Sequence, residues 1–452
     1  MEFIAPLDAL FLLAESREHP MHVGSLQLFE PPEDAGPDYL RDFRDTLLAD
    51  KTCRPTFRKR PATWLGAPQL AWAQEGEVDL DYHVQHSALP APGRLANLLD
   101  HTSTLHSGLL DRHRPLWELH FVEGLADGRF ALYSKMHHAL IDGVSAQRIL
   151  RRTLSTDPFG TEVTAPWNLP RTVRPEVERV SRSKLGGLLG GLSAAGSSTA
   201  ALLKATRTGL LQQQLTLPFE APHTLFNVPI GGARKCVVRT WSLDRVKQVK
   251  KATGTTVNDV VLAMSAGALR SYLLERDALP DKPMIAMVPV SLREEHDTDS
   301  QGVKVAALLC NLGTDIADPL ERLRVVSEST RRNKEVYRSL TPTQTLAVAG
   351  LMLSPMAAML LPGFASMGAP PFNIVISNVP GPREPLYWNG SRLDATYPLS
   401  IPLDGQAVNI TLTSTGDNLD IGLVGCRRTV PDLHRLLDHL ERSLSALEDA
   451  AA

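Results

Sequence analysis

The stretch that most constrains the fold covers residues 130–154, where a strand pattern runs through a short polar loop into a helix pattern. Residues 130–136 resemble a strand, and residues 144–154 carry apolar side chains at helical spacing. Two histidines, an aspartate and a glycine lie between them. Such a junction places polar side chains at the carboxyl end of a strand, where catalytic groups are often found. We therefore expect the active site here.

The composition indicates an ordinary soluble globular protein with more than one hydrophobic core. The chain has 452 residues, of which 43% are hydrophobic and 21% charged, with a formal net charge of -3. This length exceeds what one core usually supports, and the charge argues against nucleic acid as a partner. The four cysteines form no C-x-x-C pair, and residues 1–8 lack the features of a secretory signal. We expect a cytoplasmic protein.

The first half of the chain alternates between helix and strand patterns. A short helix is expected at residues 6–15, a strand at 21–29 and a second helix at 39–48. Residues 117–122 and 130–134 form an expected hairpin that delivers the two histidines. These elements predict an α/β layered domain over the first third of the chain.

The second half repeats this alternation after a segment rich in Pro, Gly, Ser and Ala at residues 156–220. Strands are expected at 236–241 and 284–290, and a capped helix runs from 255 to 275. We predict two domains, at residues 1–155 and 226–452, joined by a linker with helical segments at residues 156–225.

A long apolar stretch separates Arg338 from Arg383, with no charged residue between them. Its core at residues 346–361 is shorter than the roughly 20 apolar residues that a membrane span needs, and it contains Pro355. A buried helix pair is one interpretation. A surface that faces lipid or rests on a membrane is the other, and residues 339–382 could also line an apolar path for substrate.

The paired histidines favour acid–base chemistry over metal binding. His137 and His138 are adjacent, so an extended backbone would direct their side chains to opposite faces, and no third ligand lies nearby in the sequence. His138 precedes Asp142 by four residues, and a histidine with a reference pKa of about 6.5 suits general-base catalysis. A structural interpretation also exists, with His137 in the core, Asp142 as a helix cap and Gly143 permitting the turn.

Three missing motifs narrow the chemistry. The sequence contains no G-x-S-x-G nucleophile elbow, no Walker phosphate loop and no G-x-G-x-x-G fingerprint. Serine hydrolases, nucleotide hydrolases and dinucleotide oxidoreductases are therefore disfavoured. A base without a protein nucleophile fits direct transfer, in which the base takes the proton of an acceptor hydroxyl that attacks an activated acyl donor such as a thioester.

Residues 137–143 match every fixed position of H-H-x-x-x-D-G, and the chain thereby resembles the CoA-dependent acyltransferase superfamily. Further stretches resemble more narrowly the bacterial wax ester synthase/diacylglycerol acyltransferase family. In chain order they are PLDALF at 6–11, MHVG at 21–24, RPLWE at 114–118, VND at 257–259 and SNVPGP at 377–382. The family pattern often has a second tryptophan where this chain has Glu118.

The resemblance implies a fold of the α+β type with two chloramphenicol-acetyltransferase-like domains. Each would be a mixed sheet flanked by helices, and the active-site tunnel would lie between them. By the same resemblance, His138 is the catalytic base and His137 supports it. Asp142 keeps the motif loop in shape through a buried ion pair, and Gly143 leaves room for substrate.

The resemblance also assigns supporting roles outside the histidine motif. Asn258 and Asp259 would support the site from the second domain, although the start of a capped helix is their structural interpretation. Three more stretches near the pocket or tunnel also fit packing and turn chemistry: Pro115, Leu116 and Trp117, then Ser377 and Asn378, and the turn that follows at 379–382.

The implied reaction is transfer of a long-chain acyl group from acyl-CoA to a fatty alcohol or a diacylglycerol. No permanently bound cofactor or metal is expected, and acyl-CoA is the donor substrate. The insoluble acceptors suggest peripheral attachment at the inner membrane or at lipid inclusions. Two alternatives stay open: a lipid-binding or lipid-droplet protein without catalysis, and a condensation-type transferase with another acceptor. The acyl chain length and the oligomeric state are left open.

Overall fold

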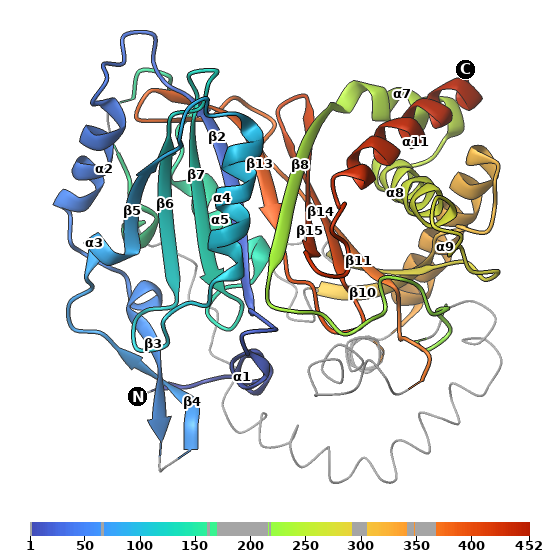
Figure 1. The fold of residues 1–452 in the computed structure, drawn as a ribbon, viewed down its shortest axis with the longest axis horizontal. Helices are drawn as coiled ribbons and strands as arrows, with labels where there is room; N and C mark the ends of the chain where they lie inside the picture. Colours follow the sequence, from blue (N-terminus) through green and yellow to red (C-terminus); the bar gives the residue numbers. More distant parts are fainter. Residues whose placement is uncertain are drawn as a thin grey trace.

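Two large β-sheets stand side by side in the computed structural model (Figure 1). Each large sheet has six strands, and a small three-stranded sheet accompanies them within the part of the chain that the structure describes. The described residues are 2–64, 67–160, 163–169, 216, 218–291, 305–340, 348 and 368–452. Most of the predicted linker at 156–225 and of the apolar stretch at 339–382 therefore lies outside the described residues.

The first large sheet contains strands from both halves of the sequence. In spatial order these are β12 (Tyr387–Trp388), β13 (Ser391–Leu399), β2 (His22–Glu30), β7 (Phe130–His137), β6 (Trp117–Glu123) and β5 (Val84–Ala88). The β5 and β6 strands are parallel and the other neighbours are antiparallel, so the sheet is mixed.

The second large sheet is also mixed, with β11 parallel to both of its neighbours. In spatial order it contains β10 (Val305–Asn311), β9 (Ile285–Ser291), β11 (Ile374–Val379), β14 (Val408–Thr415), β15 (Asn418–Cys426) and β8 (Arg234–Ser242). The small sheet consists of β1 (Glu2–Phe3), β4 (Ala67–Gln74) and β3 (Lys59–Trp64).

Helices flank the sheets in both halves. In the first half they are α1 (Pro6–Ala14), α2 (Tyr39–Ala49), α3 (Leu80–His83), α4 (Leu95–Ser107) and α5 (Gly143–Arg152), with short 3-10 turns at Pro55–Arg58 and Pro166–Asn168. In the second half they are α7 (Leu243–Thr253), α8 (Val257–Leu274), α9 (Pro319–Ser339) and α11 (Arg435–Ala451).

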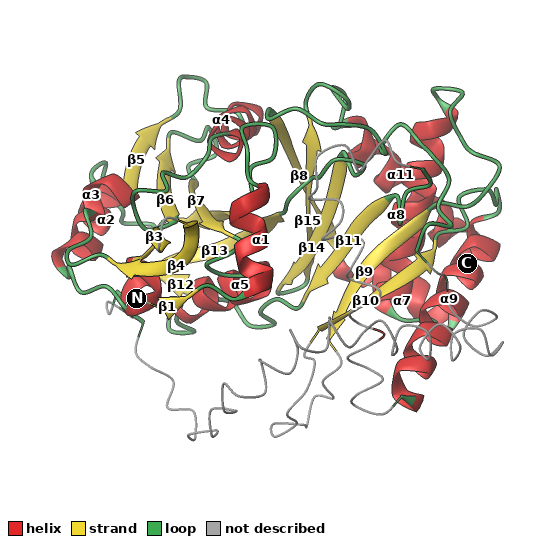
Figure 2. Cartoon of the chain, turned by 90° about the horizontal axis from the view of Figure 1, so that it is seen from below, coloured by secondary structure: helices red, strands yellow, loops and turns green. Residues whose placement is uncertain are grey.

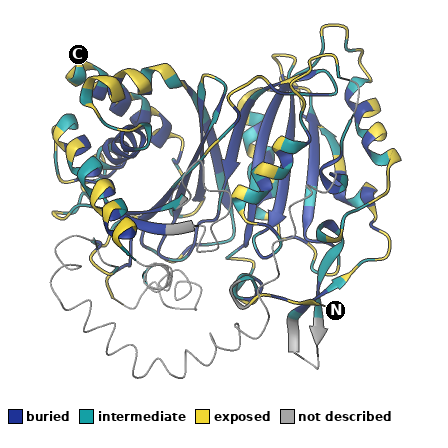
Figure 3. Ribbon diagram, turned by 180° about the vertical axis from the view of Figure 1, so that it is seen from behind, coloured by how far each residue is buried: buried dark blue, intermediate teal, exposed yellow. Residues whose placement is uncertain are grey.

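The core of the second half is built around α8. Its residues 259–269 are all buried, so the helix is enclosed on every side, as a helix with apolar residues all round should be. Figure 3 shows α8 in the colour of buried residues, whereas α11 and α9 present exposed faces. Gly267 allows α8 and α11 to approach, because a Cβ atom there would lie 2.2 Å from Ser443 Oγ.

The two large sheets meet where β13 of the first sheet packs against β14 and β15 of the second, with β8 nearby (Figures 1 and 2). One hydrophobic cluster joins buried side chains of both sheets, among them Leu26, Tyr133 and Val424. The outer edge of β8 is covered by α4, whose Ser103 and Ser107 hydroxyls accept the backbone N–H groups of Cys236 and Arg234 at 2.9 and 2.8 Å. The junction is thus both apolar and hydrogen-bonded.

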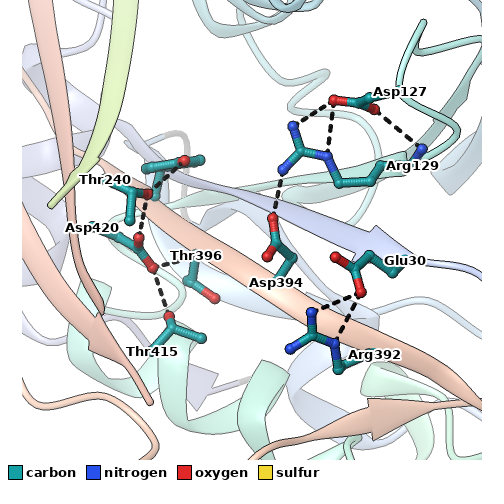
Figure 4. A network of polar contacts seen from close by, with 10 residues as sticks. Glu30, Asp127, Arg129, Thr240, Arg392, Asp394, Thr396, Thr415 and Asp420 are labelled. Atoms are coloured by element: carbon teal, nitrogen blue, oxygen red, sulfur yellow. Dashed lines mark hydrogen bonds and ion pairs between the residues drawn. The ribbon is translucent and has the colours of Figure 1, made fainter. Parts of the chain in front are cut away.

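Asp420 of β15 forms the polar centre of this junction (Figure 4). Its carboxylate accepts hydrogen bonds from Thr240 Oγ1 at 2.6 Å, from Thr415 Oγ1 at 2.7 Å and from the backbone N–H of Thr396 at 2.9 Å. The Thr396 contact links β15 to β13, that is, the second sheet to the first. Burial raises the pKa of the Asp420 carboxyl to about 6.

Most locally predicted elements agree with the structure, including the hairpin of β6 and β7 and the helix at α8. In contrast, the strands β12 and β13 follow residue 226 but join the sheet of the first half, which the sequence did not predict. The proposed domain boundaries at residues 155 and 226 therefore do not separate the strands of the two sheets. They stay a prediction about folding units.

Candidate active site

The histidine motif lies at the carboxyl end of β7, which occupies an interior position in the first sheet. All residues of β7 are buried, and the strand ends at His137, so His138 already belongs to the following turn. The partner strand β2 contains Gly24, where a Cβ atom would lie 2.9 Å from Tyr133 Cε2. This close approach explains why a glycine stands in the middle of a strand.

His137 is fully buried, and its two ring nitrogens face different partners. Its Nδ1 accepts the backbone N–H of Ala139 at 3.1 Å, and its Nε2 lies 3.4 Å from Glu15 Oε1. The second distance is long for a hydrogen bond, so we treat it as an electrostatic contact. The backbone N–H of His137 donates to the carbonyl of Leu116 at 3.0 Å, which links the motif to the residue before β6.

His138 is half-buried and stacks on Phe11 of α1. The ring centroids are 4.1 Å apart with an interplanar angle of 22°, and the backbone N–H of His138 donates to the carbonyl of Met21 at 2.8 Å. Burial lowers the pKa of His138 to about 4, against the opposing field of Asp142. Its Nδ1 has no hydrogen-bond partner among the described residues. The ring is therefore neutral at physiological pH.

Both histidine rings contact α1 or the residue after it, whereas an extended backbone would have directed them to opposite faces. The difference arises because the strand ends between the two residues. His137 keeps the strand direction, and His138 takes the direction of the turn.

The expected buried ion pair of Asp142 is wrong in this structure. Asp142 is exposed and is the N-cap of α5, with Oδ1 accepting the backbone N–H of Ser145 at 2.7 Å. No ion pair of Asp142 occurs within 4 Å among the residues that the structure describes. The carboxylate instead satisfies a free N–H group in the first turn of α5, a helix that buries few of its side chains.

A buried ion pair does exist beside the motif, but other residues form it. Glu15, whose side chain is fully buried, accepts Arg112 Nε at 3.0 Å and Nη2 at 2.9 Å, and also the backbone N–H of Met21 at 3.1 Å. Burial raises the pKa of Glu15, but contacts with His137, Met21 and Arg112 outweigh burial, so its pKa is lowered and the carboxylate is charged.

Gly143 is the first residue of α5, and the space beside it is open. The nearest atom to a Cβ built there is Val23 Cγ1 at 3.9 Å, an ordinary contact distance. Packing within the protein therefore does not demand a glycine at this position. The expected role in leaving room for substrate stays a prediction.

Asp259 is buried, and among the described residues its side chain forms hydrogen bonds only within the second half of the chain. It completes a capping box with Thr256, and its Oδ1 accepts Thr330 Oγ1 of α9 at 2.6 Å. Asn258 beside it is half-buried. The structural interpretation of Asp259 as a helix-start residue is confirmed, and no described contact joins Asn258 or Asp259 to His138.

The side chains of the Pro-Leu-Trp stretch serve mainly in packing. Leu116 is fully buried in one cluster with Leu12 of α1 and Ala139 of the motif loop. Trp117 stacks on Trp167 and donates from Nε1 to the carbonyl of Phe57 at 2.9 Å. These contacts agree with the packing interpretation, and only Leu116 lies directly beside the histidine motif.

Ser377 and Asn378 lie on β11 in the second sheet, opposite Thr411 and Leu412 of β14. No described contact joins them to the histidine motif. Phe11 and Glu15, which contact the motif, and Arg112, which pairs with Glu15, were not predicted as site residues from the sequence. Phe11 and Glu15 stand four apart on a predicted helix, and that spacing was the available signal.

Solved structures with this arrangement define the class of fold. The wax ester synthase/diacylglycerol acyltransferase from Marinobacter aquaeolei VT8 matches with a TM-score of 0.78 and 38% identity over 99% of both chains. The first condensation domain of the CDA synthetase matches with a TM-score of 0.56, 16% identity and coverage of 100% of this chain and 97% of that chain. The chain thus has the two-sheet fold shared by these acyltransferases and condensation domains.

Comparison of sequences then gives the family. The "Wax ester synthase/diacylglycerol acyltransferase catalytic domain" matches residues 4–261, and the "WS/DGAT C-terminal domain" matches residues 301–448. The "Probable diacyglycerol O-acyltransferase tgs2" of Mycobacterium tuberculosis is 56% identical over 100% of this chain and 99% of that protein. The "O-acyltransferase WSD" of Acinetobacter baylyi is 37% identical over 100% of this chain and 98% of that protein. The chain belongs to the wax ester synthase/diacylglycerol acyltransferase family.

The predicted family, the mixed two-sheet fold and the enzyme class, an O-acyltransferase of this family, are thereby confirmed. Among the described residues, no helix is long and apolar enough to cross a membrane. The core of the charge-free stretch, residues 346–361, falls outside the described residues except for residue 348.

Proposed function

We propose that this chain transfers a long-chain acyl group from acyl-CoA to a fatty alcohol or a diacylglycerol, with His138 as the general base. The observation that carries the proposal is the environment of His138, a neutral, half-buried ring at the end of β7 inside the family motif. Neutral imidazole is the form that accepts a proton. The lowered pKa makes the His138 imidazole a weaker base, but it keeps the ring in the neutral, proton-accepting form.

The chemistry requires no covalent acyl-enzyme. A ring nitrogen of His138 takes the proton from the acceptor hydroxyl while the oxygen attacks the thioester carbonyl carbon. The tetrahedral intermediate then collapses, the carbon–sulfur bond breaks, and the CoA thiolate leaves and takes the proton from the histidine. A thiol pKa of about 8.5, far below that of an alcohol, favours departure of sulfur over oxygen.

The names of the relatives support this choice of donor and acceptors. The Mycobacterium tuberculosis relative is named a diacylglycerol O-acyltransferase, and the solved Marinobacter relative is named for both wax ester and diacylglycerol chemistry. Each buried methylene of an acyl chain contributes about 0.8 kcal/mol to binding, so an apolar path can select chain length. In this proposal the path is a tunnel between the two sheets, supported by Gly143, Asn258 and Asp259 and bordered by the stretches at 115–117 and 377–378.

The test measures thiol release from palmitoyl-CoA, with hexadecanol and a diacylglycerol as separate acceptors. We expect His138→Ala to lower kcat by about 100-fold to 10,000-fold, the usual contribution of a general base. His113→Ala is the matched control, because the His113 side chain is 97% exposed and should leave turnover unchanged. Near-normal turnover of His138→Ala would refute the base assignment. Lipid binding without thiol release from any acceptor would favour the non-catalytic alternative.

The same proposal places the enzyme at the surface of the inner membrane or of lipid inclusions, because its acceptors are insoluble in water. Recovery of the purified protein with lipid vesicles after flotation is the expected result. Protein that stays entirely in the aqueous fraction would contradict peripheral attachment.

A further inference from the structure

Helix α1 contacts both histidines of the motif through its own Phe11 and through Glu15 just beyond its end. Residues four apart on a helix lie on the same face, so these two side chains reach neighbouring points of the motif loop. Leu13 lies on the opposite side of the helix, and its exposed fraction is 57%. Figures 1 and 2 show α1 at one end of the junction between the two large sheets.

The position of α1 is held by apolar packing and by Arg112. Leu12 is fully buried in a cluster with Leu116 and Ala139, so the helix is anchored to the motif loop itself. Arg112 donates from Nη2 to the carbonyl of Leu12 at 2.8 Å as well as to Glu15. The guanidinium thus fixes both the backbone end of the helix and the carboxylate that follows it.

The contacts with Ala139 and Glu15 both favour a proton on Nε2 of His137. Because a backbone N–H can only donate, the bond from Ala139 N requires that His137 Nδ1 be unprotonated. The proton of the neutral ring is therefore on Nε2, the atom that lies 3.4 Å from Glu15 Oε1. A charged carboxylate at that place favours this tautomer over the alternative.

The contact with Phe11 limits how the ring of His138 can lie. Stacking at 4.1 Å covers one face of the imidazole, and the hydrogen bond from its backbone N–H to Met21 holds the residue from the other direction. The charged and titratable groups that act on this ring or its neighbourhood are His137 and Asp142 of the motif loop and Asp8 of α1, which lies near Asp142. Water is excluded from the stacked face by Phe11.

We propose that α1 is a positioning element of the active site, in which Phe11 orients the His138 ring and Glu15 selects the tautomer of His137. This inference rests on the proposed role of His138 as the base. A base must be held within hydrogen-bond reach of the acceptor hydroxyl, and misplacement by about 1 Å can cost about 100-fold in rate. Phe11 and Glu15 act through the histidines and are positioning residues.

The first test follows kcat, KM and the pH dependence of kcat/KM in Phe11→Ala. We expect kcat to fall about tenfold while KM stays within about twofold. Loss of the stacked ring exposes His138 to water, so its pKa should rise from about 4 toward its ordinary value. The acid limb of the profile should therefore move up by about one pH unit or more. Phe11→Tyr keeps a ring and should restore the profile.

The second test concerns Glu15 and does not depend on turnover alone. In wild-type protein, the ¹⁵N shifts of the His137 side chain should report a proton on Nε2. Glu15→Gln keeps the size and one acceptor oxygen but removes the charge, and kcat should fall about tenfold with KM nearly unchanged. Leu13→Ala on the same helix is the matched control and should retain wild-type kinetics, since Leu13 is exposed.

An unmoved acid limb in Phe11→Ala would refute the role of Phe11, and a wild-type His137 with its proton on Nδ1 would refute the role of Glu15. These outcomes are distinguishable from failure of the base assignment. If His138→Ala stays active, the proposed function fails. If His138→Ala is inactive but the Phe11 and Glu15 variants behave as wild type, only the positioning role fails.

Discussion

Two helices of this protein have an aspartate of a signature motif in their capping structure, Asp142 as the N-cap of α5 and Asp259 as the third residue of α8, and the two aspartates have opposite environments. Asp142 caps α5 from an exposed position with a single bond to a backbone N–H. Asp259 at the start of α8 is 3% exposed and is bonded to Thr256 and to Thr330 of another helix. Two motif residues that both stabilise the start of a helix can therefore contribute very differently to the stability of the protein.

The difference follows from what surrounds each helix. All of residues 259–269 in α8 are buried, so a polar group at its start must be satisfied within the protein. Helix α5 buries only Ala146 and Leu150, and water can replace any contact that its cap loses. Stability should therefore depend on Asp259 and much less on Asp142, while activity depends on the loop that Asp142 closes.

The largest expected effect is that of Asp259→Ala. Removal of this carboxylate leaves the backbone N–H of Thr256 without its partner and Thr330 Oγ1 with the Ser327 carbonyl alone, and we expect a loss of about 3 kcal/mol in the free energy of unfolding. Urea unfolding measures it. Asp244→Ala is the control, an exposed first-turn acid of α7 that should cost less than about 1 kcal/mol. Equal losses of unfolding free energy in Asp259→Ala and Asp244→Ala would contradict the special importance of the buried carboxylate.

A smaller effect is expected at the other helix start. Asp142→Ala should lower the free energy of unfolding by about 1 kcal/mol, because one capping bond is lost. Asp142→Asn should keep both stability and thiol release, since asparagine caps helices as well as aspartate does. A folded but inactive Asp142→Asn would show that the negative charge itself is needed near His138, and the capping account would then be incomplete.

The smallest expected effect on stability is that of Gly143→Ala. A Cβ atom there meets only Val23 Cγ1 at 3.9 Å, so the free energy of unfolding should stay within about 0.5 kcal/mol of wild type. If the open space beside Gly143 serves substrate, KM should rise while stability does not change. An unaltered KM for both acceptors would contradict the expected role in substrate room.

Local patterns predicted the parts of the fold that depend on neighbouring residues. The alternation before His137 and the helical spacing after Gly143 were sufficient for β7 and α5, and the capping signal at Thr256 was sufficient for the start of α8. The packing partners of these elements are set by contacts between distant residues, which periodicity does not encode. For this reason the position of β13 beside β2 was not predicted.

In the candidate site, too, local patterns predicted some residues, whereas contacts between distant residues were not predicted. The histidine pair follows from one short stretch, and the cap formed by Asp142 was among the stated interpretations. The ion pair of Glu15 with Arg112 joins residues 97 apart, so no local motif marks it. A buried charge needs an opposite charge nearby, but the sequence does not say which arginine supplies it.

The strand β13 has a consequence for how the chain is synthesised. Arg392 at the start of β13 pairs with Glu30 of β2 across a sequence separation of 362 residues. While the ribosome is still making the second half, one edge of β2 therefore lacks its final neighbour, and an open strand edge can pair with other chains. Pairing between distant segments forms slowly, so this edge of β2 stays open until nearly the whole chain has emerged.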